Sequence, residues 1–434
     1  MIKNSLKYLF LALLFSTGLM AQVQVGQPIL GAASGDYFGE NTAINGNGTI
    51  VAGFATMHDS NKGHVRVFQY TPTGNASWTQ MGSDIDGESA NDNGAIENGG
   101  NNIALNLAGN ILAFGSVNDD GTATNAGHVR VFQFISGNWV QMGDDIDGEA
   151  QSDNLGVSVA LSDDGYTIVI GANEHDDDGA SQTGAIYVYT WNGSAWVQKG
   201  SSLHGSANHL FGNDVSVNSN GTIIAGSSRR ASSNKGQVKI YQYNSSATDS
   251  WTLIGSILGE ANNDYSGASI SLNSSGNIIA IGATNNTGAN GSQSGHVRVY
   301  KYSPTGNASW TQLGADIDGE SASDYFGDAV SLSGDGFTLA VGARQNEGGG
   351  STRGGVYIYK FTPTETTSWT QFRTDIDGGT SNNAFWGESV SISKDGTRVV
   401  GGSCLADDGP GSNAGLLKVF DFLPEVDIFP EAAR

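Results

Sequence analysis

AVSLSGDGFTLAVG, at residues 329–342, is the stretch of sequence that decides the fold. It holds two runs of apolar and β-branched residues around a Gly-Asp-Gly turn at residues 334–336, which predicts a tight hairpin. Two further runs follow at residues 355–361 (GVYIYKF) and 368–373 (SWTQFR). Both are rich in aromatic and β-branched residues, so the segment predicts a unit of four short strands.

This unit recurs along the chain with a period of roughly 60 residues, the signature of a repeat architecture. A glycine in the first turn marks each copy, at Gly48, Gly109, Gly165, Gly221, Gly276, Gly336 and Gly396. A tryptophan marks the fourth strand, at Trp78, Trp139, Trp196, Trp251, Trp310 and Trp369. We interpret these six tryptophans as blade-to-blade packing, with stacking on sugar rings as the alternative.

The two ends of the chain complement one another. The last unit stops after residues 416–422 (LLKVFDF) and has no fourth strand, whereas residues 25–31 (VGQPILG) align with residues 81–87 (MGSDIDG) of the first unit. The sequence therefore predicts an all-β, seven-bladed β-propeller over residues 22–422, with four-stranded blades and an N-terminal strand that closes the last one. A short C-terminal tail follows at residues 423–434.

Residues 1–21 are predicted to be a cleaved signal peptide. Lys3 and Lys7 precede a short apolar run, and Ala21 stands just before the expected cleavage point. The run is too short to span a bilayer, so we expect no membrane insertion. The prediction is a secreted protein, located outside the cell or at its surface.

The charge balance and cysteine content narrow the possible partners. The chain carries 20 Lys and Arg against 43 Asp and Glu, a formal net charge of −23. This excess repels phosphates, so we expect no nucleic-acid partner. Cys404 is the only cysteine, which excludes an intrachain disulfide and a thiolate-rich zinc site. We expect a monomer held together by its core.

The units share a second pattern: Phe-Gly, an apolar strand, then Gly-Ala, as in Phe326-Gly327 followed by Gly342-Ala343. This resembles the FG-GAP repeat of integrin α-subunit propellers, and more closely the FG-GAP-like repeats of bacterial secreted proteins. The resemblance implies a propeller with ligand recognition on one face, as in cell adhesion. Integrin-type repeats often carry a calcium loop between strands one and two. Here that connection is a tight turn, so those calcium sites are not transferred to this chain.

In an up-and-down blade, the loops between strands two and three share a face with the blade-to-blade connections. Both sets are acidic in this chain, whereas the opposite face is nearly neutral. We therefore predict a ligand-binding face formed by the loops. Its candidate residues are Asp119, Asp120, His175, Asp176, Asp177, Asp178, Asp407 and Asp408.

Three blade-to-blade connections read D-I-D-G-E and are candidates for Ca²⁺, which prefers six to eight oxygen ligands. Their acids are Asp84, Asp86, Glu88, Asp145, Asp147, Glu149, Asp316, Asp318 and Glu320. The alternative is structural, because an apolar residue and the glycine persist in all seven copies while the acids do not. In that interpretation the apolar side chain packs in the core, the glycine allows the backbone to turn, and the carboxylates are solvated.

The histidines fall into two sets. His64, His128 and His296 occupy one position of three Gly-His-Val-Arg-Val strands, and we interpret them as strand-face residues. His175 lies beside three aspartates and is either a metal ligand or part of a solvated loop.

No nucleophile elbow, zinc-protease helix or phosphate loop occurs in the chain. Arg229, Arg230 and Arg344 are the only candidates for an arginine cluster at the propeller axis. We predict a non-enzymatic binding or adhesion scaffold that recognises an extracellular protein or polysaccharide through the acidic loop face, with no catalytic residue. The alternative is a carbohydrate-active enzyme, a hydrolase or lyase, which requires unique polar residues near the axis. Differences between the blades are scattered along the sequence, which favours the scaffold.

Overall fold

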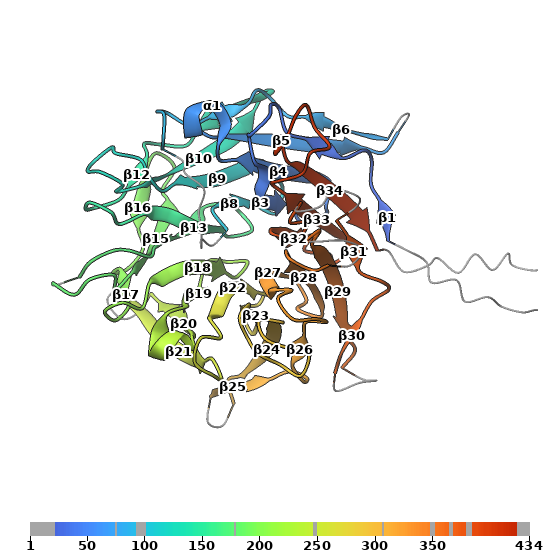
Figure 1. The fold of residues 1–434 in the computed structure, drawn as a ribbon. Helices are drawn as coiled ribbons and strands as arrows, with labels where there is room; N and C mark the ends of the chain where they lie inside the picture. Colours follow the sequence, from blue (N-terminus) through green and yellow to red (C-terminus); the bar gives the residue numbers. More distant parts are fainter. Residues whose placement is uncertain are drawn as a thin grey trace, which may run out of the picture.

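The computed structural model describes residues 22–422, except residues 74–75, 93–100, 178, 246–249, 306–307, 348–351, 364–367 and 379–383. The predicted signal peptide at 1–21 and the tail at 423–434 lie outside the described residues. Seven small antiparallel sheets surround a central axis (Figure 1). This arrangement confirms the predicted seven-bladed β-propeller.

Each blade contains four main strands, numbered from the axis outward. Strand one is β3 (Phe38–Ile44), β8 (Ile103–Leu105), β13 (Leu155–Leu161), β18 (Phe211–Val217), β22 (Ser266–Leu272), β27 (Phe326–Leu332) and β32 (Val390–Ile392). Strand two is β4 (Ile50–Ala55), β9 (Ile111–Ser116), β14 (Thr167–Ala172), β19 (Ile223–Ser228), β23 (Ile278–Ala283), β28 (Thr338–Ala343) and β33 (Arg398–Ser403). Strand three is β5 (His64–Thr71), β10 (His128–Ile135), β15 (Ala185–Trp191), β20 (Gln237–Asn244), β24 (His296–Ser303), β29 (Gly355–Phe361) and β34 (Leu416–Asp421). Strand four is β6 (Ser77–Gln80), β11 (Asn138–Gln141), β16 (Trp196–Gln198), β21 (Ser250–Leu258), β25 (Ser309–Gln312), β30 (Trp369–Gln371) and β1 (Val23–Gln24).

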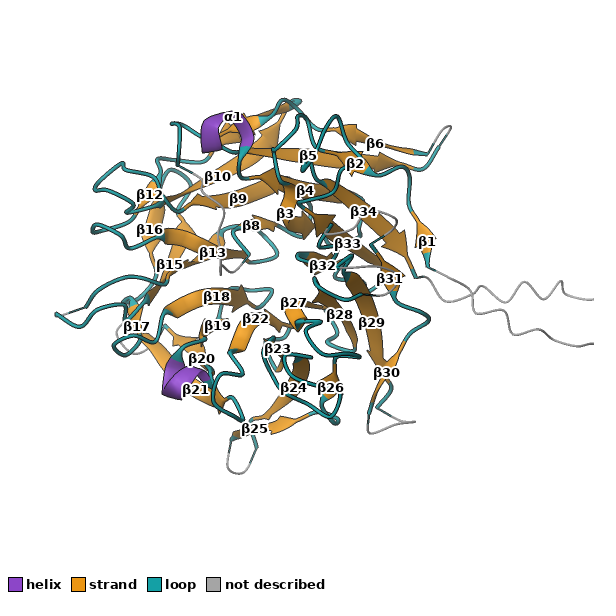
Figure 2. Ribbon diagram, viewed as in Figure 1, coloured by secondary structure: helices purple, strands orange, loops and turns teal. Residues whose placement is uncertain are grey.

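Six blades add a two-residue strand that pairs with strand three just before the chain enters the next blade. These strands are β7 (Ile85–Asp86), β12 (Ile146–Asp147), β17 (Leu203–His204), β26 (Ile317–Asp318), β31 (Ile376–Asp377) and β2 (Ile29–Leu30). In blade 4 the last residues of the long β21 take the place of this strand, since Ile257 and Leu258 pair with Val238 and Gln237 of β20. In the described part of the chain, helix is limited to the four-residue turns α1 (His58–Asn61) and α2 (Ala231–Asn234) (Figure 2). Among the described residues, no helix is long and apolar enough to cross a membrane.

The N-terminal segment closes the ring as predicted. β1 pairs with β34 through Val23 opposite Asp421, and β2 pairs with it through Ile29 opposite Leu417. The first blade then locks onto this segment, because the indole Nε1 of Trp78 donates to the carbonyl of Val25 at 2.8 Å. The outer edge of the last blade is therefore paired rather than left open to other chains.

The same tryptophan contact joins most neighbouring blades and confirms the predicted packing role. Each indole donates to a backbone carbonyl of the preceding blade: Trp139 to Met81, Trp196 to Met142, Trp251 to Lys199 and Trp369 to Leu313. Each bond satisfies the indole N–H and joins one blade to the next, whereas the Nε1 of Trp310 has no hydrogen-bond partner among the described residues.

The Phe-Gly and Gly-Ala motifs are two sides of one inter-blade contact. A Cβ added to Gly342 of β28 would lie 1.9 Å from the carbonyl oxygen of Gly387 in the next blade. A Cβ added to Gly402 of β33 would likewise lie 1.9 Å from the carbonyl oxygen of Gly39. No side chain fits at these positions, so the paired glycines allow neighbouring sheets to approach backbone to backbone.

Serines join the innermost strands around the axis. The Ser331 hydroxyl of β27 accepts the N–H of Ile392, and the Ser389 hydroxyl accepts the N–H of Thr42. In the same way, the backbone N–H groups of Leu272, Val330 and Leu332 donate to the hydroxyls of Ser216, Ser269 and Ser271, respectively. These bonds satisfy backbone donors on strands that have no ladder partner toward the axis, and they leave the axis polar.

The two ends of the axis differ. We call the end with the strand one–two turns the turn face, and the end with the long loops the loop face. At the turn face, seven backbone hydrogen bonds run from blade to blade, joining the turns at residues 46, 107, 163, 219, 274, 334 and 394–395 into a ring. Lys394 reaches across this ring, with its Nζ 2.5 Å from Asp163 and 3.3 Å from Ser219 and Ser274. The axis is therefore constricted at the turn face.

Candidate functional site

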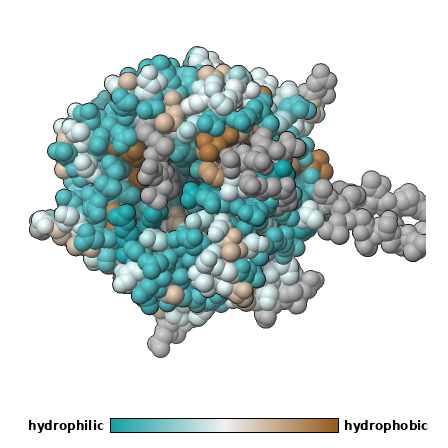
Figure 3. Space-filling view, in the orientation of Figure 1, coloured by the Kyte–Doolittle hydropathy of each residue, from teal (hydrophilic) through white to brown (hydrophobic). Residues whose placement is uncertain are grey.

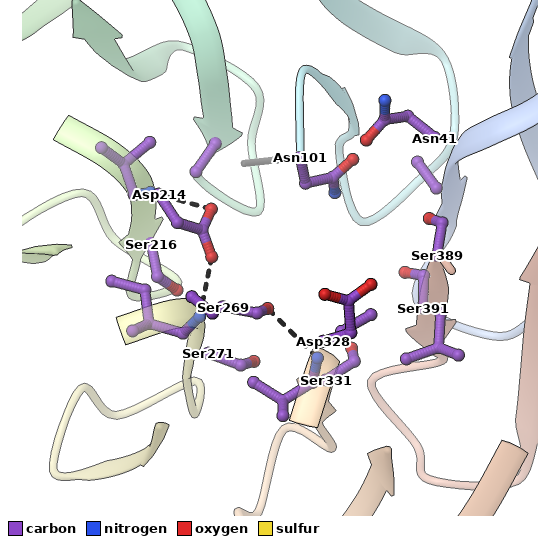
Figure 4. Close-up of a pocket in the computed structure, with 18 of the residues that line it drawn as sticks. Asn41, Asn101, Asp214, Ser216, Ser269, Ser271, Asp328, Ser331, Ser389 and Ser391 are labelled. Carbon is purple, nitrogen blue, oxygen red and sulfur yellow. Dashed lines mark hydrogen bonds between the residues drawn. The ribbon is translucent and has the colours of Figure 1, made fainter. Parts of the chain in front are cut away.

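A cavity of about 490 Å³ follows the axis. The view along the axis shows a mostly hydrophilic surface that is hollowed near the centre (Figure 3). The close-up shows Asp214, Ser269 and Ser331 among the side chains that surround the cavity, each from the first strand of a different blade (Figure 4). The inner strands of the different blades therefore line the cavity with similar polar side chains, and a residue that occurs in only some blades can be recognised against this repeat.

Three acids gather at the loop-face end of this cavity. Glu40, Asp328 and Glu388 occupy one position in three consecutive blades, two residues after the aromatic residue that opens strand one. In blades 3 and 5 the same position holds Val157 and Ala268, which carry no charge. The acids are thus additions of individual blades rather than part of the repeat.

Each acid contacts the residue sixteen positions later, just after strand two of its own blade. Glu40 accepts a hydrogen bond from Thr56, and Glu388 accepts one from the Cys404 thiol at 2.7 Å. Asp328 forms an ion pair with Arg344, with an Oδ2–Nε distance of 3.4 Å. Their side chains remain 17% and 31% exposed, respectively, so the pair is accessible from the loop face.

Arginines and tyrosines complete this constellation. The guanidinium of Arg229 lies over the ring of Tyr265, with 5.4 Å to its centroid, and that of Arg344 lies over Tyr325 at 5.7 Å. Both tyrosines have a left-handed backbone, with φ of 54° and 53°, just before strand one. We call this group the axial mouth: Glu40, Arg229, Tyr265, Tyr325, Asp328, Arg344 and Glu388.

Burial sets the protonation of two acids in the cavity. It raises the pKa of Glu388 to about 7 and that of Asp214 to about 7, even though Asp214 accepts hydrogen bonds from backbone N–H groups. Burial also raises the pKa of Asp328, although Arg344 opposes that shift. The charge of the cavity therefore changes near neutral pH.

Glu388 gives the protein a measurable pH dependence. Its ordinary pKa is 4.5, so between pH 4.5 and about pH 7 the folded chain keeps a proton that the unfolded chain has lost. The free energy of unfolding then falls as the pH rises through this window. We expect the Glu388→Gln variant to escape this fall and to gain on the order of 2 kcal/mol over the wild type between pH 4.5 and 8, measured by urea unfolding.

The matched control is Glu347→Gln, which alters an exposed loop acid. Its pH profile should follow that of the wild type. A Glu388→Gln profile parallel to the wild type would show that Glu388 is already ionised at low pH in the folded protein.

The acids predicted to bind calcium are placed in three environments. The first aspartate of each D-I-D-G-E loop accepts a hydrogen bond from a glutamine of strand four at 2.6 Å: Gln80 to Asp84, Gln141 to Asp145 and Gln312 to Asp316. The second, at Asp86, Asp147 and Asp318, is exposed beside a buried isoleucine. The glutamate reaches strand three of the next blade, where Glu88 meets Arg130, Glu149 meets Tyr187 and Glu320 meets Tyr357.

Among the described residues, the three acids of one loop therefore do not form a common ligand group. The groups that do form combine acids with histidine: Asp145 and Asp147 with His128, and Glu88 with Asp119 and His128. Asp316 joins His296 and Glu260.

The predicted ligand-face acids mostly shape their own loops. Asp120 accepts the N–H of Asn125, Asp176 that of Gln182 and Asp407 that of Asn413, at 2.6–2.8 Å. Asp119 accepts the N–H of Gly121. Asp177 lies 3.5 Å from His204, Asp408 lies in the last of these loops, and Asp178 lies outside the described residues.

Histidine is where the sequence interpretation missed most. His64, His128 and His296 do begin strand three, but they are 0%, 1% and 2% exposed. Their rings face carboxylates of the loops, and burial lowers the pKa of His64 to about 4. His175 is 7% exposed, with its Nδ1 3.2 Å from Asp153, so the solvated-loop alternative is wrong for this residue.

The conclusion that differences between blades are scattered is also wrong. Glu40, Asp328 and Glu388 lie far apart in the sequence, yet they meet at one end of the axis together with Arg229 and Arg344. The signal was available, because aligning the residue two positions after each Phe-Gly aromatic places all three acids in one column.

Comparison with known proteins supports the fold. The FG-GAP repeat family matches residues 146–189 and 316–359, each spanning the entry to a blade and its first three strands. No curated protein matches the chain. Among solved structures, the chain is similar to Kuenenia stuttgartiensis hydrazine synthase, with a TM-score of 0.51 and 12% identity over 87% of this chain and 94% of that chain.

At 12% identity this likeness extends to the fold alone. The two matched repeats lie in blades of a ring whose other blades have the same strands. The inter-blade glycine of strand two recurs in most blades, whereas blades 1 and 4 have Phe54 and Ser227 at that position. The chain is therefore a seven-bladed β-propeller that contains FG-GAP repeats.

Proposed function

We propose that this protein is a secreted binding scaffold, without catalytic activity of its own, that holds an extracellular polysaccharide at the axial mouth. The observation that carries the proposal is the gathering of unrepeated charged residues at the loop-face end of a cavity that is constricted at its other end. Ligand sites are typically concave, with a few polar groups that converge from a rigid frame. Here the frame is the ring of inner strands.

The chemistry of the mouth suits a sugar chain. Tyr265 and Tyr325 supply ring edges and hydroxyls, and the Arg344–Asp328 pair supplies donors and acceptors for neighbouring sugar hydroxyls. Two guanidinium groups also suit a carboxylate, which arginine binds in a bidentate manner. We therefore infer that the preferred chain contains uronic acids.

The acidic surroundings fit a role in specificity. Asp86, Asp147 and Asp318 are exposed on the loop face and repel an anionic chain except where it meets the arginines. Calcium bound between the polysaccharide and these acids is an additional proposal, and chelation during the binding experiment tests it.

The test is isothermal titration of the purified protein with oligouronates and with neutral oligosaccharides of equal length. We expect binding of the oligouronates and at least a tenfold loss of affinity in the Arg344→Met/Asp328→Asn double variant, since each lost charged contact is worth roughly 1–3 kcal/mol. Removing both partners together avoids leaving one buried charge unpaired.

Lys301→Ala, on the exposed outer part of blade 5, is the control and should bind like the wild type. Equal affinity of the double variant and the wild type would contradict the proposal. Binding of proteins but of no glycan would point to the adhesion alternative.

One observation favours an enzyme as the second candidate. Glu388, with a pKa of about 7, is suited to act as a general acid at neutral pH, and Asp328 and Glu40 lie at the same mouth. Incubation with the bound oligosaccharide distinguishes the two functions. Release of new chain ends that is abolished by Glu388→Gln would establish a hydrolase or lyase, whereas an unchanged ligand supports the scaffold.

A further inference from the structure

Blade 1 contains a second group of polar side chains, outside the axial mouth. Asp36, His58 and His64 each offer a ligand atom within 4.8 Å of the other two. A fourth donor is close, because the Oδ2 of Asp84 lies 3.7 Å from the Nδ1 of His64. The four residues come from the connection into blade 1, its α1 loop, the start of β5 and the connection out of the blade.

His64 stands out within this group. Its side chain is 0% exposed, and neither ring nitrogen has a hydrogen-bond partner among the described residues. A buried imidazole that loses water without gaining a partner destabilises the fold, so such a group requires an explanation. The ring of His58 lies against it, with the two centroids 4.0 Å apart.

In Asp36 and Asp84, one carboxylate oxygen accepts a hydrogen bond that orients the group, and the other oxygen faces a histidine. The Oδ2 of Asp36 accepts the N–H of Ala33 at 2.6 Å, which leaves Oδ1 3.0 Å from the Nδ1 of His58. The Oδ1 of Asp84 accepts from Gln80 at 2.6 Å, which leaves Oδ2 for His64. Outer hydrogen bonds of this kind orient the first ligands of metal sites.

Two of the distances between ligand atoms are close to those around a tetrahedral ion. Zinc binds imidazole and carboxylate at about 2.0–2.2 Å, which places neighbouring tetrahedral ligands about 3.3 Å apart. The distances of 3.0 Å from His58 to Asp36 and 3.7 Å from His64 to Asp84 bracket that value. Two imidazoles with two carboxylates suit zinc or a similar borderline divalent ion, whereas Ca²⁺ prefers oxygen ligands only.

Among the described residues, the other groups whose ligand atoms lie within 4.8 Å of one another lack a second imidazole. His128 with Asp145 and Asp147, and His296 with Glu260 and Asp316, each offer a single imidazole. In blade 3, the rings of His175 and His204 lie 5.3 Å apart and face Asp153 and Asp177, respectively, but their ligand atoms form no such group among the described residues. In blade 1 the second histidine comes from the α1 loop, where three consecutive residues from Asp59 to Asn61 have left-handed backbone angles. The nearest cation, Arg66, donates to the carbonyl of Leu30 and lies over the ring of Phe38.

We propose that blade 1 binds one zinc ion through Asp36, His58, His64 and Asp84. The ion joins the segment that follows the closing strands to the α1 loop and to the exit of blade 1. It thereby fastens the ring at the place where the two ends of the chain meet. This role is independent of the proposed glycan binding, because none of the four ligands belongs to the axial mouth.

The test is titration of the chelator-treated protein with ZnCl₂, followed by calorimetry, and with CoCl₂, followed by visible absorption. We expect a Zn²⁺ site with micromolar or lower Kd, a higher Tm with Zn²⁺ than with chelator, and intense Co²⁺ bands of a four-coordinate site with nitrogen ligands. His58→Ala should remove one bound ion per chain and the Co²⁺ bands. His58 is 28% exposed, so this variant should still fold, which circular dichroism checks.

Asp36→Asn is the second variant and should weaken Zn²⁺ binding at least tenfold. His209→Ala is the matched control, because it removes another half-buried loop histidine that lies outside the group. Equal Zn²⁺ stoichiometry and affinity in the wild type and in His58→Ala would overturn the proposal. A rise in Tm with Ca²⁺ but not with Zn²⁺ would also overturn it, in favour of a carboxylate site.

Discussion

Ile29→Asp is expected to lower the free energy of unfolding by more than about 4 kcal/mol, because it buries an unpaired carboxylate in the closure of the ring. Ile29 is 6% exposed and packs with Val25, Phe38 and Leu417 between the last blade and the first. A domain has only about 5–15 kcal/mol of net stability, so this change removes much of it. Urea unfolding followed by tryptophan fluorescence measures the loss.

Leu30→Asp is the matched control, one residue further along the same strand. Leu30 is 38% exposed, so its replacement should cost less than about 0.5 kcal/mol. We also expect the Ile29→Asp protein to self-associate on size-exclusion chromatography, since the released edge of β34 is free to pair. Equal effects of the two substitutions would show that β2 does not hold the ring closed.

Trp386→Ala is expected to cost about 3–5 kcal/mol, the range for removing a large aromatic side chain from a core. Trp386 is 1% exposed and its Nε1 donates to the carbonyl of Ile376 at 2.8 Å. It replaces the phenylalanine that opens strand one in blades 1, 4 and 6. Thermal and urea unfolding of the purified variant measure the loss.

A double-mutant cycle provides the control for this prediction. A Cβ at Gly401 would lie 2.7 Å from the Trp386 ring, so Gly401→Val alone should cost about 1–3 kcal/mol through overpacking. Trp386→Phe/Gly401→Val reproduces the Phe326 and Val341 pair of blade 6 and should recover most of that loss. Trp386→Phe alone completes the cycle. A loss in the double variant equal to the sum of the losses in Trp386→Phe and Gly401→Val would show that the two side chains are not coupled.

Local sequence carried most of the information about the fold. The Asp-Gly turns, the alternating strands and the seven copies of each landmark predicted the blades. The missing fourth strand at the C-terminal end predicted that β1 and β2 complete it, as their pairing with β34 shows. Repetition makes this inference secure, because each copy tests the interpretation of the others.

The candidate sites were less accessible to sequence reasoning. Acids were abundant, and the sequence offered the D-I-D-G-E loops as candidate calcium sites with a structural alternative. The structure places Asp84 near His64 and Glu88 near Arg130. The local sequence around Glu388 does not distinguish it from other glutamates. It becomes a candidate only when the ring places its blade beside the blades that carry Glu40 and Asp328. Arg344 was identified as an axial candidate, but its partner Asp328 was not.

The sequence by itself determined the strand pattern, the number of blades and the closure of the ring, because these depend on periodicity and turn chemistry within each unit. Only the tertiary structure decided which side chains meet. Residues 40, 328 and 388 converge because the ring sets corresponding positions of neighbouring blades side by side. Residues 36, 58, 64 and 84 converge because the loops at one end of blade 1 fold against the start of β5. Burial at those meeting points raises the pKa of Glu388 and lowers that of His64, and this burial depends on tertiary contacts that the local sequence around each residue does not specify.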